Sequence, residues 1–179
     1  IAALAIINDI KPNLLNKVKI IGFGDETYTS QIKQQVFKNK LNDTVIFMGY
    51  LNENALRKEI SQAQLSIIPS IWYENLPNSL IESFACGTVV IASDIGSLSK
   101  SIDNGINGFL CKPNNPESLA ETIISALSNP DLLKTMEKNA LISTKKLYSE
   151  KKHLQDLLIL FNELRHEIYY IKDGSFSVT

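Results

Sequence analysis

Short apolar runs rich in β-branched residues alternate with helical stretches along the first two thirds of the chain. Several of these runs are apolar almost throughout, which is typical of strands that are buried on both faces of a sheet. Strand–helix–strand repeats connect through right-handed crossovers. The sequence therefore predicts an α/β fold with a doubly wound parallel sheet and helices on both faces. The expected strands are 18–21, 45–48, 65–68, 88–92 and 108–111, and the expected helices between them are 28–40, 53–63 and 78–86.

The last third of the sequence changes to helices alone. Expected helices cover 116–127, 131–147 and 149 to about 171. Apolar residues recur at helical spacing in the last of these, which predicts a stripe that faces a core or another lobe. No repeat or long linker interrupts the chain, so we expect one domain over residues 1–171 and a loose tail over 172–179. The stripe consists of Leu154, Leu157, Leu158, Phe161, Leu164 and Ile168.

The chain opens on a helical stretch, Ile1–Ile10, that leads toward the first expected strand. In a parallel βαβ arrangement a crossover helix follows an earlier strand. The sequence before Val18 contains no such strand. We therefore expect these residues to be one lobe of a longer polypeptide.

Composition narrows the class of protein. The sequence has 18 Lys plus Arg against 19 Asp plus Glu, so charge gives no reason to expect nucleic acid as a partner. No apolar run reaches the roughly 20 residues that a transmembrane helix needs, and no signal peptide is evident. Cys86 and Cys111 are too few for a disulfide framework, so we expect reduced core residues. These features favour a soluble, cytoplasmic protein.

A glycine pair follows the first expected strand, in Gly22-Phe23-Gly24. A dinucleotide-binding fingerprint would carry a third glycine at position 27, where this chain has Thr27. We therefore do not expect NAD binding. The pair indicates either a tight turn or a close approach of the backbone to a ligand.

The segment after the third expected strand, 69–87, carries more chemistry. It lies where ligands bind in open α/β sheets. The backbone amides of Asn78 and Ser79 fall in the first turn of a helix, which favours a phosphate group. Glu74 precedes that helix and Glu82 lies within it, so the two carboxylates can accept hydrogen bonds from hydroxyl groups on either side of a phosphate.

The two glutamates form an E-x7-E pair inside the segments 69–78 and 85–93. With these motifs, residues 17–164 resemble the donor-binding lobe of the retaining GT-B glycosyltransferases of the large family four. The resemblance implies a Rossmann-like domain that is one lobe of a GT-B architecture and has a helical C-terminus. Further matching segments follow in the same order, at 21–24, 47–50, 104–110, 116–120 and 148–149.

The resemblance implies a nucleoside-diphosphate sugar as donor, with a UDP-sugar favoured. Glu74 would be the catalytic residue and accept from hydroxyls of the transferred hexose, and Glu82 would accept from the ribose. Backbone amides at 76, 78 and 79 would bind hexose and diphosphate, and residues 49–51 would lie near the base. Pro77 stands where many members have Gly, so one N–H donor is lost. The implied donor-binding residues are Gly22, Gly24, Gly49, Tyr50, Leu51, Glu74, Asn75, Leu76, Pro77, Asn78, Ser79 and Glu82.

The resemblance also implies the setting of the reaction. A hexose would pass with retention to an acceptor, in the synthesis of surface polysaccharide or another glycan, without a metal ion or other cofactor. The acceptor would be held by an N-terminal lobe. Members of the family also carry an Arg and a Lys that neutralise the diphosphate, and this sequence has no counterpart of that pair. The location would be the cytoplasm, including the inner face of the membrane, with any peripheral membrane association through the other lobe. His153 and His166 are expected to have no role.

Other interpretations of the same residues stay open. Both glutamates could be surface acids, or the acid and nucleophile of a glycosidase. A nucleotide-sugar epimerase on the same architecture would need acid–base groups in the cleft, and no His falls in the expected loops. A non-catalytic nucleotide-binding module is the third alternative.

Overall fold

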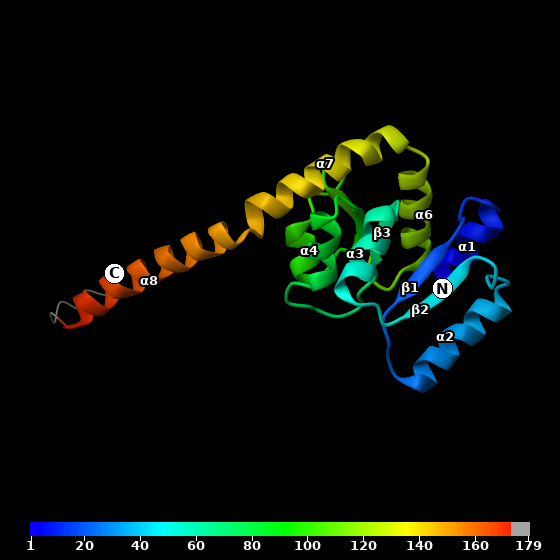
Figure 1. Ribbon diagram of the computed structural model, residues 1–179, viewed down its shortest axis with the longest axis horizontal. Coiled ribbons are helices and arrows are strands. Elements are labelled where there is room, and N and C mark those ends of the chain that lie inside the picture. Colours follow the sequence, from blue (N-terminus) through cyan, green and yellow to red (C-terminus); the bar gives the residue numbers. More distant parts are fainter. Residues whose placement is uncertain (173–179) are drawn as a thin grey trace. The chain divides into compact units, whose positions relative to one another are not determined.

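The computed structural model describes the backbone of residues 1–172 and the side chains of residues 1–165 (Figure 1). The chain forms two compact units, Ile1–Leu141 and a second that begins at Ile142. The elements of the first unit are α1 (Ala2–Ile10), β1 (Val18–Ile21), α2 (Glu26–Lys38), β2 (Val45–Gly49), α3 (Glu53–Gln62), β3 (Leu65–Ile68), α4 (Asn78–Ala85), β4 (Val89–Ser93), α5 (Gly96–Ser101), β5 (Gly108–Cys111) and α6 (Pro116–Leu127). Helix α7 (Pro130–Leu147) runs into the second unit, and α8 (Glu150–Lys172) follows.

The described strands are parallel, as the alternation of runs and helices predicts. They form two sheets, β1–β2 and β3–β4–β5. In the first, Val18 is paired with Val45; in the second, Leu65 with Val89 and Val90 with Gly108. The α/β class with parallel strands and covering helices is therefore confirmed, whereas within residues 1–172 the two pairings are not joined into one continuous sheet.

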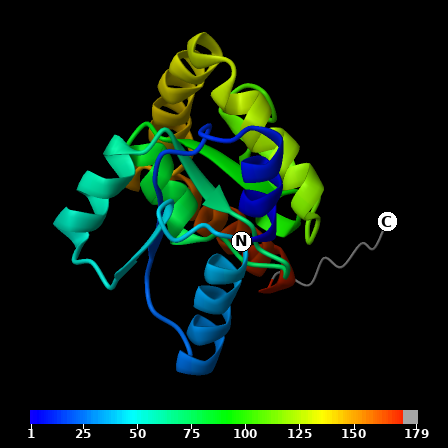
Figure 2. The same ribbon diagram turned by 90° about the vertical axis from the view of Figure 1, so that its right-hand side faces the viewer.

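The main core surrounds β4, the central strand of the larger sheet. The side chains of Val89, Val90, Ile91 and Ala92 are fully buried, as expected for a strand covered on both faces. Helices α1 and α6 pack against each other over this core (Figure 2). Deep burial of β4 fixes the position of the loops that leave the carboxyl end of the sheet.

A second cluster lies between β1, β2 and α2. It is centred on Val36, Leu41 and Val45, and Leu4 of α1 packs against it. Other residues of α1, Ala3 and Ile7, belong to the main core. One helix therefore contributes to the cores of both sheets.

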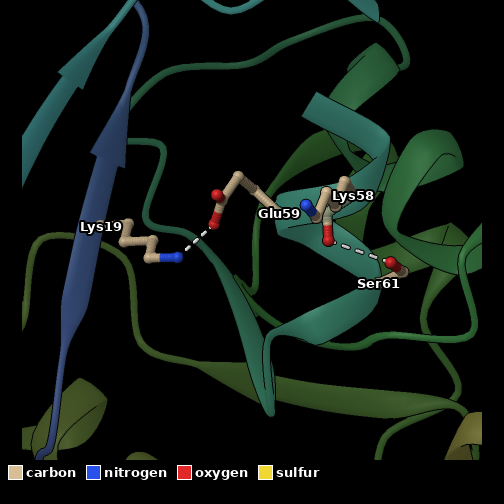
Figure 3. Close-up of polar contacts among 4 residues, drawn as sticks. All are labelled: Lys19, Lys58, Glu59 and Ser61. Carbon is tan, nitrogen blue, oxygen red and sulfur yellow. Dashed lines mark hydrogen bonds and ion pairs between the residues drawn. The ribbon is translucent and has the colours of Figure 1, made fainter. Parts of the chain in front are cut away.

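An ion pair joins β1 to α3. The Nζ atom of Lys19 donates to the carboxylate of Glu59, which points toward the strand from the middle of the helix (Figure 3). On the same helix the hydroxyl of Ser61 donates to the carbonyl of Lys58. Because Lys19 alternates with Val18 and Ile20, its side chain leaves the opposite face of β1 from theirs.

Element boundaries differ from the sequence prediction where capping decides them. The expected start of α2 at Tyr28 is wrong: Asp25 accepts a hydrogen bond from the Tyr28 amide at 2.9 Å, so the helix begins at Glu26. β4 begins at Val89, one residue later than expected, because the backbone amide of Thr88 donates to the carbonyl of Ser83 in α4 at 2.9 Å. The six-residue helix α5 was not predicted at all.

The second unit contains the end of α7 and helix α8. In the predicted stripe, Leu154, Leu158, Phe161 and Leu164 are exposed and Leu157 is half-buried. His153 is exposed as well. The side chains of His166 and Ile168 lie outside the described residues, as does the predicted tail apart from Lys172, which ends α8. The expectation that 1–171 form one domain stays a prediction.

Candidate functional site

Two glycines connect the carboxyl ends of β1 and β2. The N–H group of Gly22 donates to the carbonyl of Gly49 at 2.8 Å. Their φ angles are +122° and +64°, values that side-chain-bearing residues rarely adopt. A Cβ atom at Gly22 or Gly24 would meet nothing within 4 Å, so the backbone here is open to solvent. The predicted site segment Gly22–Gly24 is therefore a turn whose backbone a ligand can approach closely.

Two aromatic side chains lie together at this turn. Phe23 is 86% exposed and Tyr50 is 73% exposed. Their ring centroids are 6.2 Å apart, with a 60° angle between the planes. Tyr50 was among the predicted site residues and Phe23 was not, although Phe23 lies between two glycines directly after a strand. Leu51 beside them is half-buried.

Glu74 is held in place at the carboxyl end of β3. The hydroxyl of Ser70 donates to its Oε1 atom at 2.6 Å, and the hydroxyl of Ser97 in α5 donates to its backbone carbonyl at 3.1 Å. Gly96 allows this approach: its φ is +59°, and a Cβ there would lie 3.1 Å from Cδ1 of Tyr73. The carboxylate is half-buried with one oxygen engaged by Ser70. Neither Ser70 nor Ser97 was predicted from the sequence to bind this residue.

Helix α4 begins immediately after this loop, and its first residue has no side-chain cap. The N-cap residue is Pro77, whose side chain cannot accept a hydrogen bond. In contrast, Asp25, Asn52 and Asn115 cap α2, α3 and α6 with side-chain oxygens. The amide of Leu80 donates to the carbonyl of Pro77 at 3.0 Å, whereas the amides of Asn78 and Ser79 are left for solvent or a ligand. Of the remaining predicted site residues, Asn75, Asn78 and Ser79 are exposed, and Leu76 is half-buried.

The opposite side of α4 anchors the helix in the core. Leu80 and Phe84 are fully buried, and the hydroxyl of Ser83 donates to Oγ of Ser66 at 2.8 Å. Glu82 lies on the exposed side of the helix. Hydrogen bonds from two serines hold Glu74, whereas the carboxylate of Glu82 extends toward solvent. The site thus contains one ordered carboxylate and one exposed carboxylate.

A shallow cavity of about 180 Å³ lies at the carboxyl ends of the larger sheet. Its lining includes Pro69, Ser93 and Cys111, together with residues 1–3 at the start of α1, and includes neither glutamate. Burial raises the pKa of the Cys111 thiol, and the nearby Asp94 carboxylate adds to the effect. The thiol therefore stays protonated and is a poor nucleophile. Cys86 and Cys111 are both free, as the sequence predicts.

Among residues with described side chains, no group of three or more His, Cys, Asp or Glu is placed to hold a metal ion. Within the described helices, none combines the length and the hydropathy needed to cross a membrane. The chemistry that the site offers is hydrogen bonding and stacking: carboxylates for hydroxyl groups, helix amides for an anion and aromatic rings for a planar group.

The chain is similar in sequence to known glycosyltransferases. A model of the family described as "Glycosyl transferases group 1" matches residues 2–142. An uncharacterized glycosyltransferase of Methanocaldococcus jannaschii is 31% identical over 113 residues, which is 63% of this chain and 28% of that protein. The chain spans 28–40% of the length of the first three curated relatives it matches.

Solved structures share the fold. Sucrose-phosphate synthase from Thermosynechococcus elongatus superposes with a TM-score of 0.79 at 26% identity, over 93% of this chain and 42% of that one. A mutant of S. aureus TarM in complex with fondaparinux, alpha-GlcNAc-glycerol and UDP superposes with a TM-score of 0.74 at 25% identity, over 89% of this chain and 32% of that one.

Proposed function

Because the chain belongs to the group 1 glycosyltransferases, we propose that it is the GT-B lobe that binds a nucleoside-diphosphate sugar, with a UDP-sugar favoured. The observation that carries the proposal is the fixed carboxylate of Glu74 beside the uncapped start of α4. This arrangement places an acceptor for sugar hydroxyls next to donors for a phosphate. The UDP in the TarM structure supports the choice of nucleotide.

Each part of the donor has a proposed partner. The amides of Leu76, Asn78 and Ser79 bind the diphosphate and the hexose, and Glu74 accepts hydrogen bonds from the hexose hydroxyls. Glu82, on the exposed side of α4, accepts from the ribose hydroxyls. The open backbone at Gly22, Gly24 and Gly49, with Tyr50 and Leu51, lies near the base.

In the proposed reaction the acceptor hydroxyl attacks the anomeric carbon from the face that the phosphate leaves, so the configuration is retained. Glu74 is the catalytic residue because it holds the hexose while the carbon–oxygen bond to the phosphate breaks. The amides of α4 stabilise the negative charge that the leaving phosphate gains. No metal ion is expected to take part. The acceptor, from a polysaccharide or other glycan pathway, would be bound by another lobe, and we expect these 179 residues alone to bind donor without transfer.

The first experiment measures what Glu74 adds to donor binding. Affinities for UDP and UDP-glucose are measured by titration calorimetry for the wild type and for Glu74→Gln, with EDTA present. The ratio of the Kd for UDP to the Kd for UDP-glucose measures the contribution of the hexose. We expect this ratio to fall about tenfold in the variant, because a charged acceptor for the hexose hydroxyls is lost. The affinity for UDP should change less than about twofold, since UDP carries no hexose for Glu74 to contact.

Glu121→Gln, an exposed acid on α6, is the matched control and should leave both affinities unchanged. Ser70→Ala should give an intermediate loss, since the carboxylate then keeps its charge but loses the partner that orients it. Failure of the wild type to bind UDP, GDP or ADP would refute the proposed function. An equal sugar preference in wild type and Glu74→Gln would refute only the role of Glu74.

Phe23 provides a separate test of where the base binds. We expect Phe23→Ala to weaken UDP binding about tenfold, because stacking on an aromatic ring is worth roughly 1–3 kcal/mol per base. Inorganic pyrophosphate, which has no base, should bind both proteins equally. Phe37→Ala is the control, since Phe37 is similarly exposed, at 73%, near the end of α2. An equal loss of pyrophosphate and UDP binding would indicate a general disturbance of the turn instead.

A further inference from the structure

The loop that carries Glu74 has few polar contacts. Outside the strand pairing, residues 69–76 of the described chain take part in two hydrogen bonds, and Glu74 accepts both. The first is internal to the loop, from the hydroxyl of Ser70 to Oε1 of Glu74. The second comes from another element, because the hydroxyl of Ser97 in α5 donates to the backbone carbonyl of Glu74 at 3.1 Å. The loop is otherwise open to solvent, and the neighbouring side chain of Tyr73 is 82% exposed.

Helix α5, in contrast, is anchored in the core. Leu98, the residue after Ser97, is 1% exposed, and Ile102 at the C-cap is 3% exposed. The helix follows β4, whose residues are all buried. Between the strand and the helix, the amide of Asp94 donates to the carbonyl of Cys111 at the end of β5, at 2.8 Å. The hydroxyl of Ser97 therefore joins an exposed loop to a helix with a fixed position.

The loop and the start of α5 also approach each other closely. A Cβ atom at Gly96 would lie 3.1 Å from Cδ1 of Tyr73 and 3.6 Å from the backbone oxygen of Glu74. Ser97, the next residue, directs its hydroxyl to that same oxygen. Because this hydrogen bond holds the backbone of Glu74, it fixes the point from which the side chain extends. The carboxylate itself stays available to Ser70 and to a ligand.

We propose that Ser97 is a positioning residue for Glu74. Its hydroxyl ties the loop to the core, so that the carboxylate meets the hexose of the donor in one orientation. The inference rests on the proposed function, because the hexose is the group that Glu74 is proposed to hold. It makes recognition of the sugar depend on α5, a helix that contributes none of the proposed donor-binding residues. Since Ser97 acts through Glu74, its removal should weaken binding of the hexose and spare the nucleotide.

Titration calorimetry with UDP and UDP-glucose tests the proposal. In Ser97→Ala we expect the ratio of the Kd for UDP to the Kd for UDP-glucose to fall about threefold, because a neutral hydrogen bond contributes less than the charged acceptor that Glu74→Gln removes. The Kd for UDP itself should change less than about twofold. Ser97→Thr keeps a hydroxyl and should restore the ratio. Ser99→Ala, which changes another half-buried serine of α5, is the matched control and should leave the ratio unchanged.

A double variant shows whether Ser97 acts through Glu74. In the Glu74→Gln background, Ser97→Ala should change the ratio by less than about 1.5-fold, because no charged acceptor is left to position. A fall as large as in the Glu74 background would overturn the proposal. So would an unchanged ratio in Ser97→Ala alone, or an equal loss of affinity for UDP and UDP-glucose, which would indicate a general disturbance of the site.

A signal that needs no nucleotide separates this proposal from the proposed function. Trp72, the only tryptophan in the sequence, lies in the same loop as Glu74 and is 63% exposed. Its fluorescence anisotropy should decay faster in Ser97→Ala, because the untied loop gains nanosecond motion, and Ser97→Thr should restore the wild-type decay. If the wild type binds no nucleotide, the proposed function is refuted and this decay alone decides the role of Ser97. A decay that is the same in Ser97→Ala and wild type would overturn that role.

Discussion

Replacing Phe84 by alanine is expected to lower the free energy of unfolding by about 3–5 kcal/mol, the range for a large aromatic residue removed from a core. The ring of Phe84 is fully buried on the inner side of α4, a helix that packs on β3 and β4. Loss of its contacts leaves a cavity under the helix whose first turn forms the proposed phosphate site. Chemical denaturation of the wild type and the variant measures the effect.

The matched control is Phe37→Ala, which removes the same side chain from an exposed position. It should change stability by no more than about 0.5 kcal/mol. Below its unfolding transition, Phe84→Ala should also bind UDP more weakly, because α4 no longer keeps its position. A loss of stability as small as that of the control would show that Phe84 does not anchor the helix.

Replacing Glu82 by alanine is expected to weaken UDP binding about tenfold to a hundredfold. A charge-assisted hydrogen bond contributes roughly 1.5–3 kcal/mol, and each 1.4 kcal/mol is a factor of about ten. The side chain is exposed on α4, so its removal should leave folding almost unchanged. Titration calorimetry with UDP measures the change, and Glu121→Ala serves as the control for removal of an exposed helix acid.

A comparison of nucleotides isolates the ribose contact. Wild type should prefer UDP to 2′,3′-dideoxy-UDP, whereas Glu82→Ala should bind the two equally. This double comparison separates a direct contact from a general electrostatic effect, which would change both affinities by the same factor. If Glu82→Ala retains the full preference for UDP, another residue binds the ribose.

The local periodicity of the sequence was enough to place most elements. The run at β4 is apolar throughout, and its complete burial follows from that pattern. Pairing between strands is a long-range property, and the pattern of each run carries no information about its neighbour. For this reason the alternation predicted parallel strands but not their division into two sheets. Helix α5 was missed because six residues are too few to show an apolar period.

The candidate site was predicted in outline, through Glu74 and the start of α4. The residues that orient Glu74 could not be predicted, because Ser70 and Ser97 are separated in sequence and ordinary in type. Their role depends on the approach of α5 to the loop, which Gly96 permits. The roles of Glu82 and of the first-turn amides of α4 stay predictions until ligand binding is measured.

The separation between the buried strands and the exposed turns at their carboxyl ends affects how this protein can be engineered. The turn at Gly22 to Gly24, the segment after Gly49 and the loop that holds Glu74 each leave a strand whose core contacts lie below them. Under the proposed function, exchanging these short segments should change ligand preference without repacking the interior. A library restricted to these positions would sample new specificities while most of its members still fold.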